Sequence, residues 1–218
     1  MGMRTGEKGR SFEGIWGGRN YEALASAFGM GPRFYERALG GLVLAPGMKA
    51  LDLGCGPGGL SFALGARSPV DTQIHGVDLS VDQLDLASRR AGRVSCSLRF
   101  HRCSMDELPF PDGEFDLVMT SMALHETPPE VRRRTVGEVA RVLRDGGRFL
   151  LVDWSRPHLG LWGAVWFPLV CWGERNRDNW NNVYPELCRS RDLILEEDCY
   201  LNSITRRQLF RKAPRPAA

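Results

Sequence analysis

The sequence lacks a hydrophobic run long enough to cross a membrane. The apolar segment 159–172 carries no charge over 14 residues, but Pro168 interrupts it, and a spanning helix needs about 20 apolar residues. The N-terminal residues also lack the apolar core of a signal peptide. We therefore expect no transmembrane helix. Three roles stay open for segment 159–172: a lid over a binding site, a homodimer contact, or a surface that touches a membrane peripherally through its tryptophans.

Paired cysteines and a clustered basic face are also missing. The six cysteines form no C-x-x-C pair and have no histidines at metal-binding spacing, so neither a metal site nor a disulfide framework is expected. Unpaired thiols favour a reducing, cytoplasmic location. The 29 basic and 26 acidic residues leave a net charge of only +3, and a nucleic-acid partner is therefore not expected.

The chain does contain enough apolar sequence for one large domain. It has 218 residues, 43% of them hydrophobic and 25% charged, which is ordinary for a single globular domain. After residue 48, short β-rich runs alternate with amphipathic helical patterns, as in a parallel sheet covered by helices. The predicted core strands are Lys49–Leu53, Gln73–Asp78, Ser97–Arg102, Phe115–Thr120 and Arg148–Trp154.

Two core helices have recognisable starts. Ser80 and Gln83 have the spacing of a capping box, in which each side chain bonds the backbone of the other residue. Thr127 and Glu130 repeat this spacing around two prolines, which are tolerated in the first turn of a helix. Helices are therefore predicted to run from these starts to about residue 91 and residue 143.

These patterns divide a single domain, residues 1–218, into four parts. Residues 1–45 predict a helical N-terminal cap, and residues 46–154 a ligand-binding core. Residues 155–192 hold the apolar segment and a helix, and residues 193–212 an antiparallel strand pair. The expected fold is α/β and Rossmann-like, with a seven-stranded mixed sheet that is mostly parallel, a reversed C-terminal strand, and helices on both faces.

A glycine-rich turn follows the first core strand in the stretch LDLGCGPGG, from Leu51 to Gly59. Its spacing fits the G-x-G-x-x-G pattern of dinucleotide sites, where glycines let a ligand approach the backbone. Asp52 lies just before the turn, and a carboxylate there would repel a pyrophosphate but attract an ammonium or sulfonium group. The turn therefore favours a cationic ligand such as S-adenosylmethionine over a dinucleotide.

Asp78 ends the next strand in the stretch GVDLS, where an acidic side chain can accept hydrogen bonds from both hydroxyls of a ribose. With LDLGCGPGG, GVDLS and MDELPFPDGEFDLV in this order, the chain from about Leu42 to Trp154 resembles the class I S-adenosylmethionine-dependent methyltransferases. It is particularly similar to the ubiquinone and menaquinone biosynthesis branch. The resemblance implies S-adenosyl-L-methionine as cofactor and S-adenosyl-L-homocysteine as product.

The residues expected at the cofactor are Asp52, Gly54, Cys55, Gly56, Gly58, Asp78, Leu79, Ser104, Met105, Asp106 and Ser121. By resemblance, Asp52 and the glycine turn hold the methionine part. Leu79 lies on the adenine face, and Met105 and Asp106 meet the adenine edge. Ser104 stands where the family commonly has an aspartate, so its hydrogen bond to the adenine amino group is weaker than a carboxylate would make.

The segment after the fourth core strand, SMALHETPP, is expected beside the transferred methyl group. His125 is its candidate catalytic base, and the alternative is a histidine packed under the following helix. The segment lacks the Asn/Asp-Pro-Pro-aromatic motif typical of methyltransferases that act on nucleobase amino groups. Together with the aromatic residues elsewhere in the chain, this segment predicts a small apolar or aromatic acceptor that is quinone-like, lipid-like or a secondary metabolite.

Two other functions stay open. A non-catalytic S-adenosylmethionine-binding regulatory protein would share the glycine turn and Asp78 but would turn over no acceptor. A nicotinamide-dependent oxidoreductase is disfavoured by Asp52 and because the sequence has no recognisable hydride-transfer residues.

Overall fold

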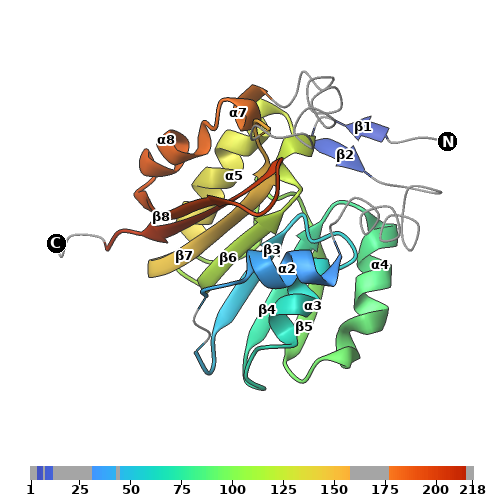
Figure 1. Ribbon diagram of the computed structural model, residues 1–218. Helices are drawn as coiled ribbons and strands as arrows, with labels where there is room; N and C mark the ends of the chain where they lie inside the picture. The colour runs from blue at the N-terminus through green and yellow to red at the C-terminus, as the bar shows by residue number, and fades with distance from the viewer. Residues whose placement is uncertain (1–3, 7, 12–30, 43–44, 158–176, 215–218) are drawn as a thin grey trace.

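The computed structural model describes residues 4–6, 8–11, 31–42, 45–157 and 177–214. Its centre is a seven-stranded sheet with strand order β5-β4-β3-β6-β7-β9-β8 (Figure 1). The strands are β3 (Lys49–Leu53), β4 (Gln73–Asp78), β5 (Ser97–Arg102), β6 (Phe115–Ser121), β7 (Leu143–Trp154), β8 (Leu193–Tyr200) and β9 (Thr205–Lys212). Strands β3 to β7 are parallel, and β9 is antiparallel to both β7 and β8. The predicted mixed sheet with a reversed C-terminal strand is confirmed.

The burial of the side chains in each strand agrees with the strand's position in the sheet. In β3 the four residues Ala50–Leu53 are all buried, as expected for a central parallel strand with helices on both faces. Strand β8 forms an edge of the sheet, and most of its side chains are exposed. Its acidic residues Glu196, Glu197 and Asp198 form ion pairs with arginines of β9. Charges of this kind protect an edge strand from pairing with another chain.

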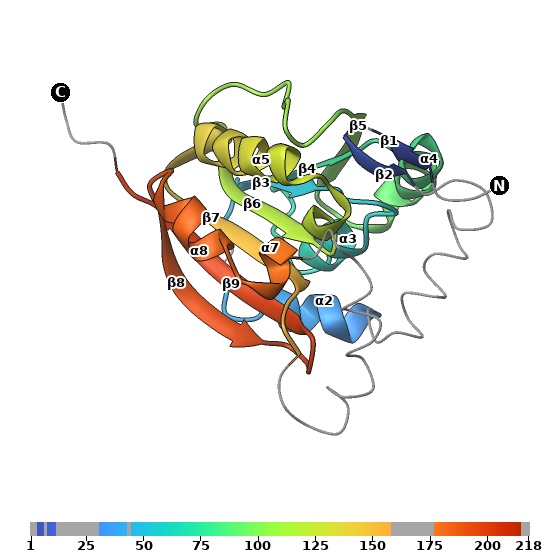
Figure 2. The same cartoon turned by 90° about the horizontal axis from the view of Figure 1, so that it is seen from above.

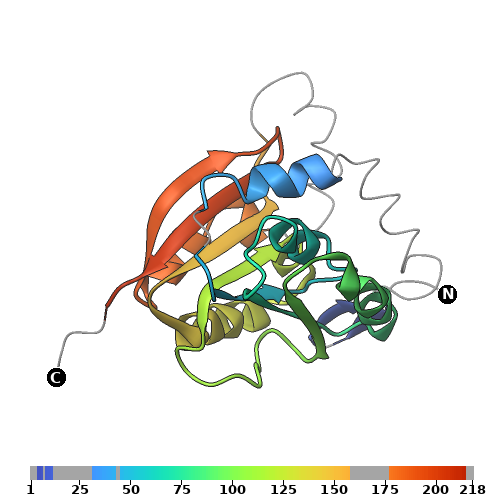
Figure 3. The same cartoon turned by 90° about the horizontal axis from the view of Figure 1, so that it is seen from below.

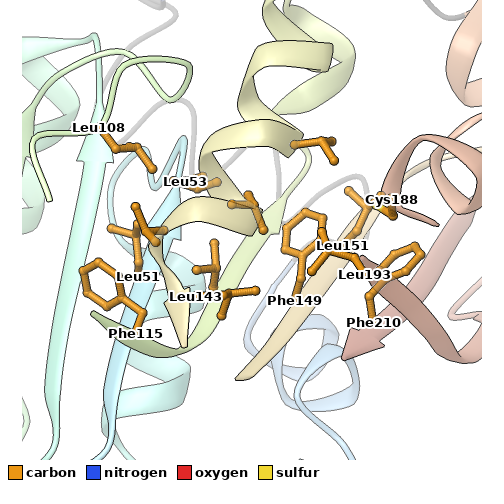
Figure 4. Close-up of a cluster of buried hydrophobic side chains, with 14 of the residues drawn as sticks. Leu51, Leu53, Leu108, Phe115, Leu143, Phe149, Leu151, Cys188, Leu193 and Phe210 are labelled. Atoms are coloured by element: carbon orange, nitrogen blue, oxygen red, sulfur yellow. The ribbon is translucent and has the colours of Figure 1, made fainter. Parts of the chain in front are cut away.

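Helices cover both faces of the sheet, as predicted (Figure 2). Helices α2 (Pro32–Ala38) and α3 (Gly59–Gly65) pack on one face, which is seen from below in Figure 3. Helices α5 (Pro129–Val142) and α8 (Tyr184–Arg189) pack on the other, over the apolar cluster shown in Figure 4. Among the described residues, no helix combines the length and the apolar character that a membrane crossing requires.

The remaining elements are short or lie at the edge of the sheet. Helix α4 (Val81–Arg90) packs beside β4 and β5 and leads into the 3-10 turn η2 (Ala91–Arg93). A second 3-10 turn, η3 (Leu124–Glu126), follows β6, and α7 (Arg177–Trp180) precedes α8.

Both predicted capping boxes are wrong. Ser80 is the N-cap residue of α4 but makes no side-chain cap bond. Its amide N–H, which Gln83 was expected to bind, donates instead to the carboxylate of Asp78 at 2.8 Å. Helix α5 begins at Pro129, with Pro128 as its N-cap residue. The hydroxyl of Thr127 instead donates to the carbonyl of Leu124 at 2.7 Å. Two consecutive prolines have no amide N–H to satisfy, so α5 has less need of a cap.

The N-terminal part differs from the predicted helical cap. Helix α2 lies within residues 1–45, but β1 (Arg4–Gly6) and β2 (Gly9–Ser11) pair as an antiparallel hairpin. No alternation of apolar residues predicts this hairpin in the sequence. Most of the rest of the predicted cap, residues 12–30, and the apolar segment 159–172 lie outside the described residues. The roles of that segment as lid, homodimer contact or membrane surface therefore stay predictions.

Candidate functional site

A cavity lies at the carboxyl ends of β3, β4, β5 and β6, the place where open α/β sheets bind ligands. Its walls are the glycine turn after β3, the turn between β4 and α4, and the segments that follow β5 and β6. Eight residues predicted at the cofactor line it: Gly54, Cys55, Gly56, Asp78, Leu79, Ser104, Met105 and Ser121. Four other predicted site residues do not line it: Asp52, Gly58, Asp106 and His125.

The glycine turn needs its glycines for conformation and for space. Gly54 has φ +63°, and an added Cβ would lie 2.4 Å from the Cβ of Ala123. Gly56 has φ +51°, and an added Cβ there would meet no heavy atom within 4 Å. The turn therefore leaves open space beside its own backbone, where a ligand can approach closely.

Asp78 links the glycine turn to the start of α4. One carboxylate oxygen accepts the amide N–H of Gly56 and the other accepts that of Ser80, each at 2.8 Å. Burial raises the pKa of Asp78, while these backbone bonds lower it. Each carboxylate oxygen can accept a second hydrogen bond. Asp78 can therefore receive two further donors from the cavity, which matches the predicted contact with a ribose.

Asp52 does not reach the cavity. It is 1% exposed, and its carboxylate accepts the hydroxyl of Ser61, in α3, at 2.6 Å. Burial raises the pKa of Asp52 to about 7, so much of its charge is lost at neutral pH. In this structure Asp52 joins β3 to α3 and does not line the cavity, so its predicted contact with a cationic ligand stays a prediction. Gly58 likewise serves the fold, as the N-cap residue of α3 at φ +86°.

Asp106 is held by cations and a hydroxyl outside the cavity. Its buried carboxylate bonds Lys8 Nζ at 3.1 Å and Arg134 at 2.7 Å, and it also accepts the hydroxyl of Ser104. Burial opposes its charge, but these donors lower the pKa of Asp106 below its usual value. The carboxylate therefore joins the N-terminal hairpin to α5 and does not line the cavity, and its predicted contact with the adenine edge stays a prediction. The hydroxyl of Ser104 is directed to the same carboxylate.

His125 lies behind the cavity, between two carboxylates. Its Nδ1 is 2.7 Å from Asp153 and its Nε2 is 3.1 Å from Glu126. Burial lowers the pKa of His125, but Asp153 and then Glu126 raise it to about 9 overall. At neutral pH the ring is charged and bonded at both nitrogens, so it cannot accept a proton. This arrangement disfavours the predicted catalytic base and makes His125 a positioning residue for Glu126, which does line the cavity.

Several cavity residues were not predicted at the site. Lys8 and Tyr35 come from the N-terminal hairpin and α2. They are far from the motifs in sequence, and no local sequence pattern predicts that they lie at the site. Gln83 was interpreted only as a capping residue. Glu126 follows His125 directly, and the combination of a carboxylate with histidine was the signal that could have identified it.

Met122 also lines the cavity, and its backbone has φ +55°, which is costly for a residue with a side chain. Its amide N–H donates to the carbonyl of Val152, in β7, at 2.9 Å. This bond holds the strained turn that leads from β6 into the cavity wall.

Comparison with known proteins agrees with this geometry. Residues 50–147 match the family described as "Methyltransferase domain", and these residues contain the glycine turn, Asp78 and the segment after β6. This part of the chain, a little under half of it, is similar to class I methyltransferase domains. The cofactor of this class is S-adenosyl-L-methionine.

Two curated relatives and one solved structure illustrate the similarity. The chain is 38% identical over 141 residues to the uncharacterized methyltransferase sll0829 of Synechocystis, which covers 63% of this chain and 60% of that protein. It is 33% identical over 147 residues to a demethylmenaquinone methyltransferase of Deinococcus radiodurans, covering 66% and 60%. It thus spans about 60% of the length of these two relatives. The structure of YcgJ from Bacillus subtilis superposes with a TM-score of 0.61 and 25% identity, covering 77% of this chain and 70% of YcgJ.

The polar groups of the cavity fit S-adenosylmethionine. Gly56 offers backbone beside open space, and Asp78 can accept the two ribose hydroxyls. Two buried cavity atoms, Gln83 Oε1 and Ser121 Oγ, have no hydrogen-bond partner in the described structure, and a buried polar atom of this kind costs stability until a ligand satisfies it. These residues can hold a ligand with several donors, and the cofactor supplies the methyl group that is transferred.

Proposed function

We propose that this protein transfers the methyl group of S-adenosylmethionine to a small, uncharged, apolar or aromatic acceptor. The observation that carries the proposal is the continuity of one cavity, which joins the glycine turn and Asp78 to the segment Ser121–Thr127. A sulfonium is already a good leaving group, so much of the rate can come from alignment and from exclusion of water. The residues of the cavity need only hold the two reactants in line.

The charge beside the Ser121–Thr127 segment argues against an anionic acceptor. Glu126 is the carboxylate of the Ser121–Thr127 segment, and its neighbours Ser121, Met122 and Ala123 carry no charge. A carboxylate at this place disfavours an anionic acceptor by repulsion. If the acceptor carries a hydroxyl, Glu126 is the group placed to take its proton, with His125 fixing the position of the carboxylate.

The names of two relatives fit this class of acceptor. One is called a demethylmenaquinone methyltransferase. Another, 27-O-demethylrifamycin SV methyltransferase of Amycolatopsis mediterranei, is 35% identical over 123 residues. Both names describe a methyltransferase that acts on a small organic molecule. A quinone-like acceptor would be drawn from a membrane. Peripheral membrane contact through segment 159–172 is therefore part of this proposal. A homodimer formed through the same segment is a second prediction.

The test is turnover by the purified chain with S-adenosylmethionine labelled in its methyl group. Candidate acceptors are a demethylated quinol, simple phenols and an anionic control such as a phosphorylated alcohol. The proposal predicts a labelled organic product and one S-adenosylhomocysteine per methyl group with an uncharged acceptor, and no product with the anion. The Asp78→Asn variant supplies the background. Tight cofactor binding without product from any acceptor would favour the alternative of a regulatory protein.

A further inference from the structure

One polar side chain in the cavity has a chemistry that neither the fold nor the family motifs explain. Gln83 lies in the first turn of α4 and is 2% exposed, yet it lines the cavity and its Oε1 has no hydrogen-bond partner in the described structure. A buried carboxamide in this state is costly. Most buried polar groups in proteins have a partner, so an exception calls for a functional explanation.

The Gln83 carboxamide does not cap helix α4. The spacing from Ser80 suits a capping box, in which the glutamine side chain would accept the Ser80 amide N–H. Asp78 accepts that N–H instead, at 2.8 Å. The carboxylate of Asp78 thus replaces the cap and leaves the Gln83 side chain available to the cavity.

The neighbours of Gln83 place it at one end of the site. Leu79 lies just before α4 and Gln83 in its first turn, and both line the cavity together with Ser104 and Met105. These residues come from the turn after β4 and the segment after β5. They lie beyond Asp78 from the glycine turn, which is the end where the base of a bound nucleoside would be found.

The other polar groups at this end are already engaged. The carboxylate of Asp106 binds Lys8 and Arg134 and does not line the cavity. The hydroxyl of Ser104 donates to the same carboxylate. The Asp106 carboxylate is therefore not placed to accept a hydrogen bond from a base. The Ser104 oxygen can still accept one, but its hydroxyl is directed to that carboxylate, whereas the carbonyl oxygen of Gln83 has no partner in the described structure.

We propose that Gln83 recognises the adenine of the cofactor through its carboxamide, with Oε1 accepting the 6-amino group and the amide nitrogen donating to an adjacent ring nitrogen. A carboxamide matches this edge of adenine because it presents one acceptor and one donor side by side. Hypoxanthine has a carbonyl oxygen in place of the amino group, so the match is lost. The inference rests on S-adenosylmethionine as the ligand of the cavity and adds the residue that selects its base.

The experiment compares two ligands by isothermal titration calorimetry on the full chain. The ligands are S-adenosylhomocysteine and S-inosylhomocysteine, which differ only at the 6-position of the base. Wild-type protein is expected to bind the adenine compound about 5- to 150-fold more tightly, the range of discrimination by a bidentate base contact. In Gln83→Met, which keeps the length and burial of the side chain, the ratio should fall toward one through weaker binding of S-adenosylhomocysteine.

The control is a second glutamine-to-methionine variant, and the ratio of the two affinities in wild-type protein is an independent test. Gln73→Met changes an exposed glutamine at the start of β4, outside the cavity, and should keep the wild-type ratio. An unchanged ratio in Gln83→Met overturns the proposal. So does equal affinity of the wild-type protein for both ligands, a result that does not depend on how well the variant folds. Absence of any S-adenosylhomocysteine binding by wild-type protein would instead refute the cofactor itself, and this inference with it.

Discussion

Raising the pH should destabilise this protein through one buried histidine. His125 is 12% exposed in its side chain and lies 2.7 Å from Asp153 and 3.1 Å from Glu126, and its pKa is about 9. In the unfolded chain the pKa is about 6.5. A pKa raised by folding stabilises the protein fully below the unfolded value, and this stabilisation is lost as the pH rises through the folded value.

The size of the effect follows from the two pKa values. His125 should contribute about 3 kcal/mol to the free energy of unfolding at pH 6.5, about 2 kcal/mol at pH 7.5, and only a few tenths of a kcal/mol at pH 9.5. The assay is urea unfolding of wild-type protein and His125→Gln at these three pH values. The difference in stability between the two proteins should shrink by about 3 kcal/mol across the series.

The control is His101→Gln, because burial lowers the pKa of His101 below its usual value and its titration falls outside this range. Its difference from wild-type protein should be nearly constant with pH. If the difference for His125→Gln is equally constant, His125 is not charged in the folded protein. The positioning role assigned to it beside Glu126 would then be wrong.

Three further outcomes are expected. Asp78→Asn should weaken S-adenosylhomocysteine binding about 10- to 100-fold in calorimetry, with a smaller change in thermal stability because the buried charge is itself costly; equal affinity would contradict the ribose contact. Gly54→Ala should lower the free energy of unfolding by about 1–3 kcal/mol because of positive φ and the contact with Ala123, and an unchanged urea midpoint would show that the turn relaxes freely. Burial, and after it the charge of the stacked ring of His101, lower the pKa of His75 to about 4. Protonation of His75 below pH 6.5 should therefore lower the melting temperature, and His75→Phe should reduce this loss of stability in acid.

The core strands could be predicted because their signals are local. Strands such as β3 and β4 are short apolar runs bounded by turn residues, and the predicted limits Lys49–Leu53 and Gln73–Asp78 match the structure. Asp78 and the glycine turn were predictable for the same reason, since chemistry and position are both encoded within a few residues. Strand β7 was predicted too short because Asp145–Gly147 looks like a turn, whereas the strand extends across it.

The partners of buried charges could not be predicted, because they come from distant parts of the chain. Asp106 was expected at the adenine, but its carboxylate is taken by Lys8, 98 residues away in sequence, and by Arg134, 28 residues away. Asp52 was expected at the ligand, and Ser61 in the next helix takes its carboxylate. A motif predicts where a carboxyl group lies on a strand, but the neighbouring elements decide which way it turns.

The most direct test of the account is a thermal shift of the full chain with S-adenosylhomocysteine and, separately, with NADH. Ligand at about 100 times its dissociation constant adds roughly 2.7 kcal/mol of stability, equivalent to about 5–10 °C for a domain of this size. S-adenosylhomocysteine is expected to raise the melting temperature by this amount, and NADH is expected to leave it unchanged. A shift with NADH alone would mean that the glycine turn and Asp78 bind a dinucleotide, and the proposed methyl transfer would be wrong.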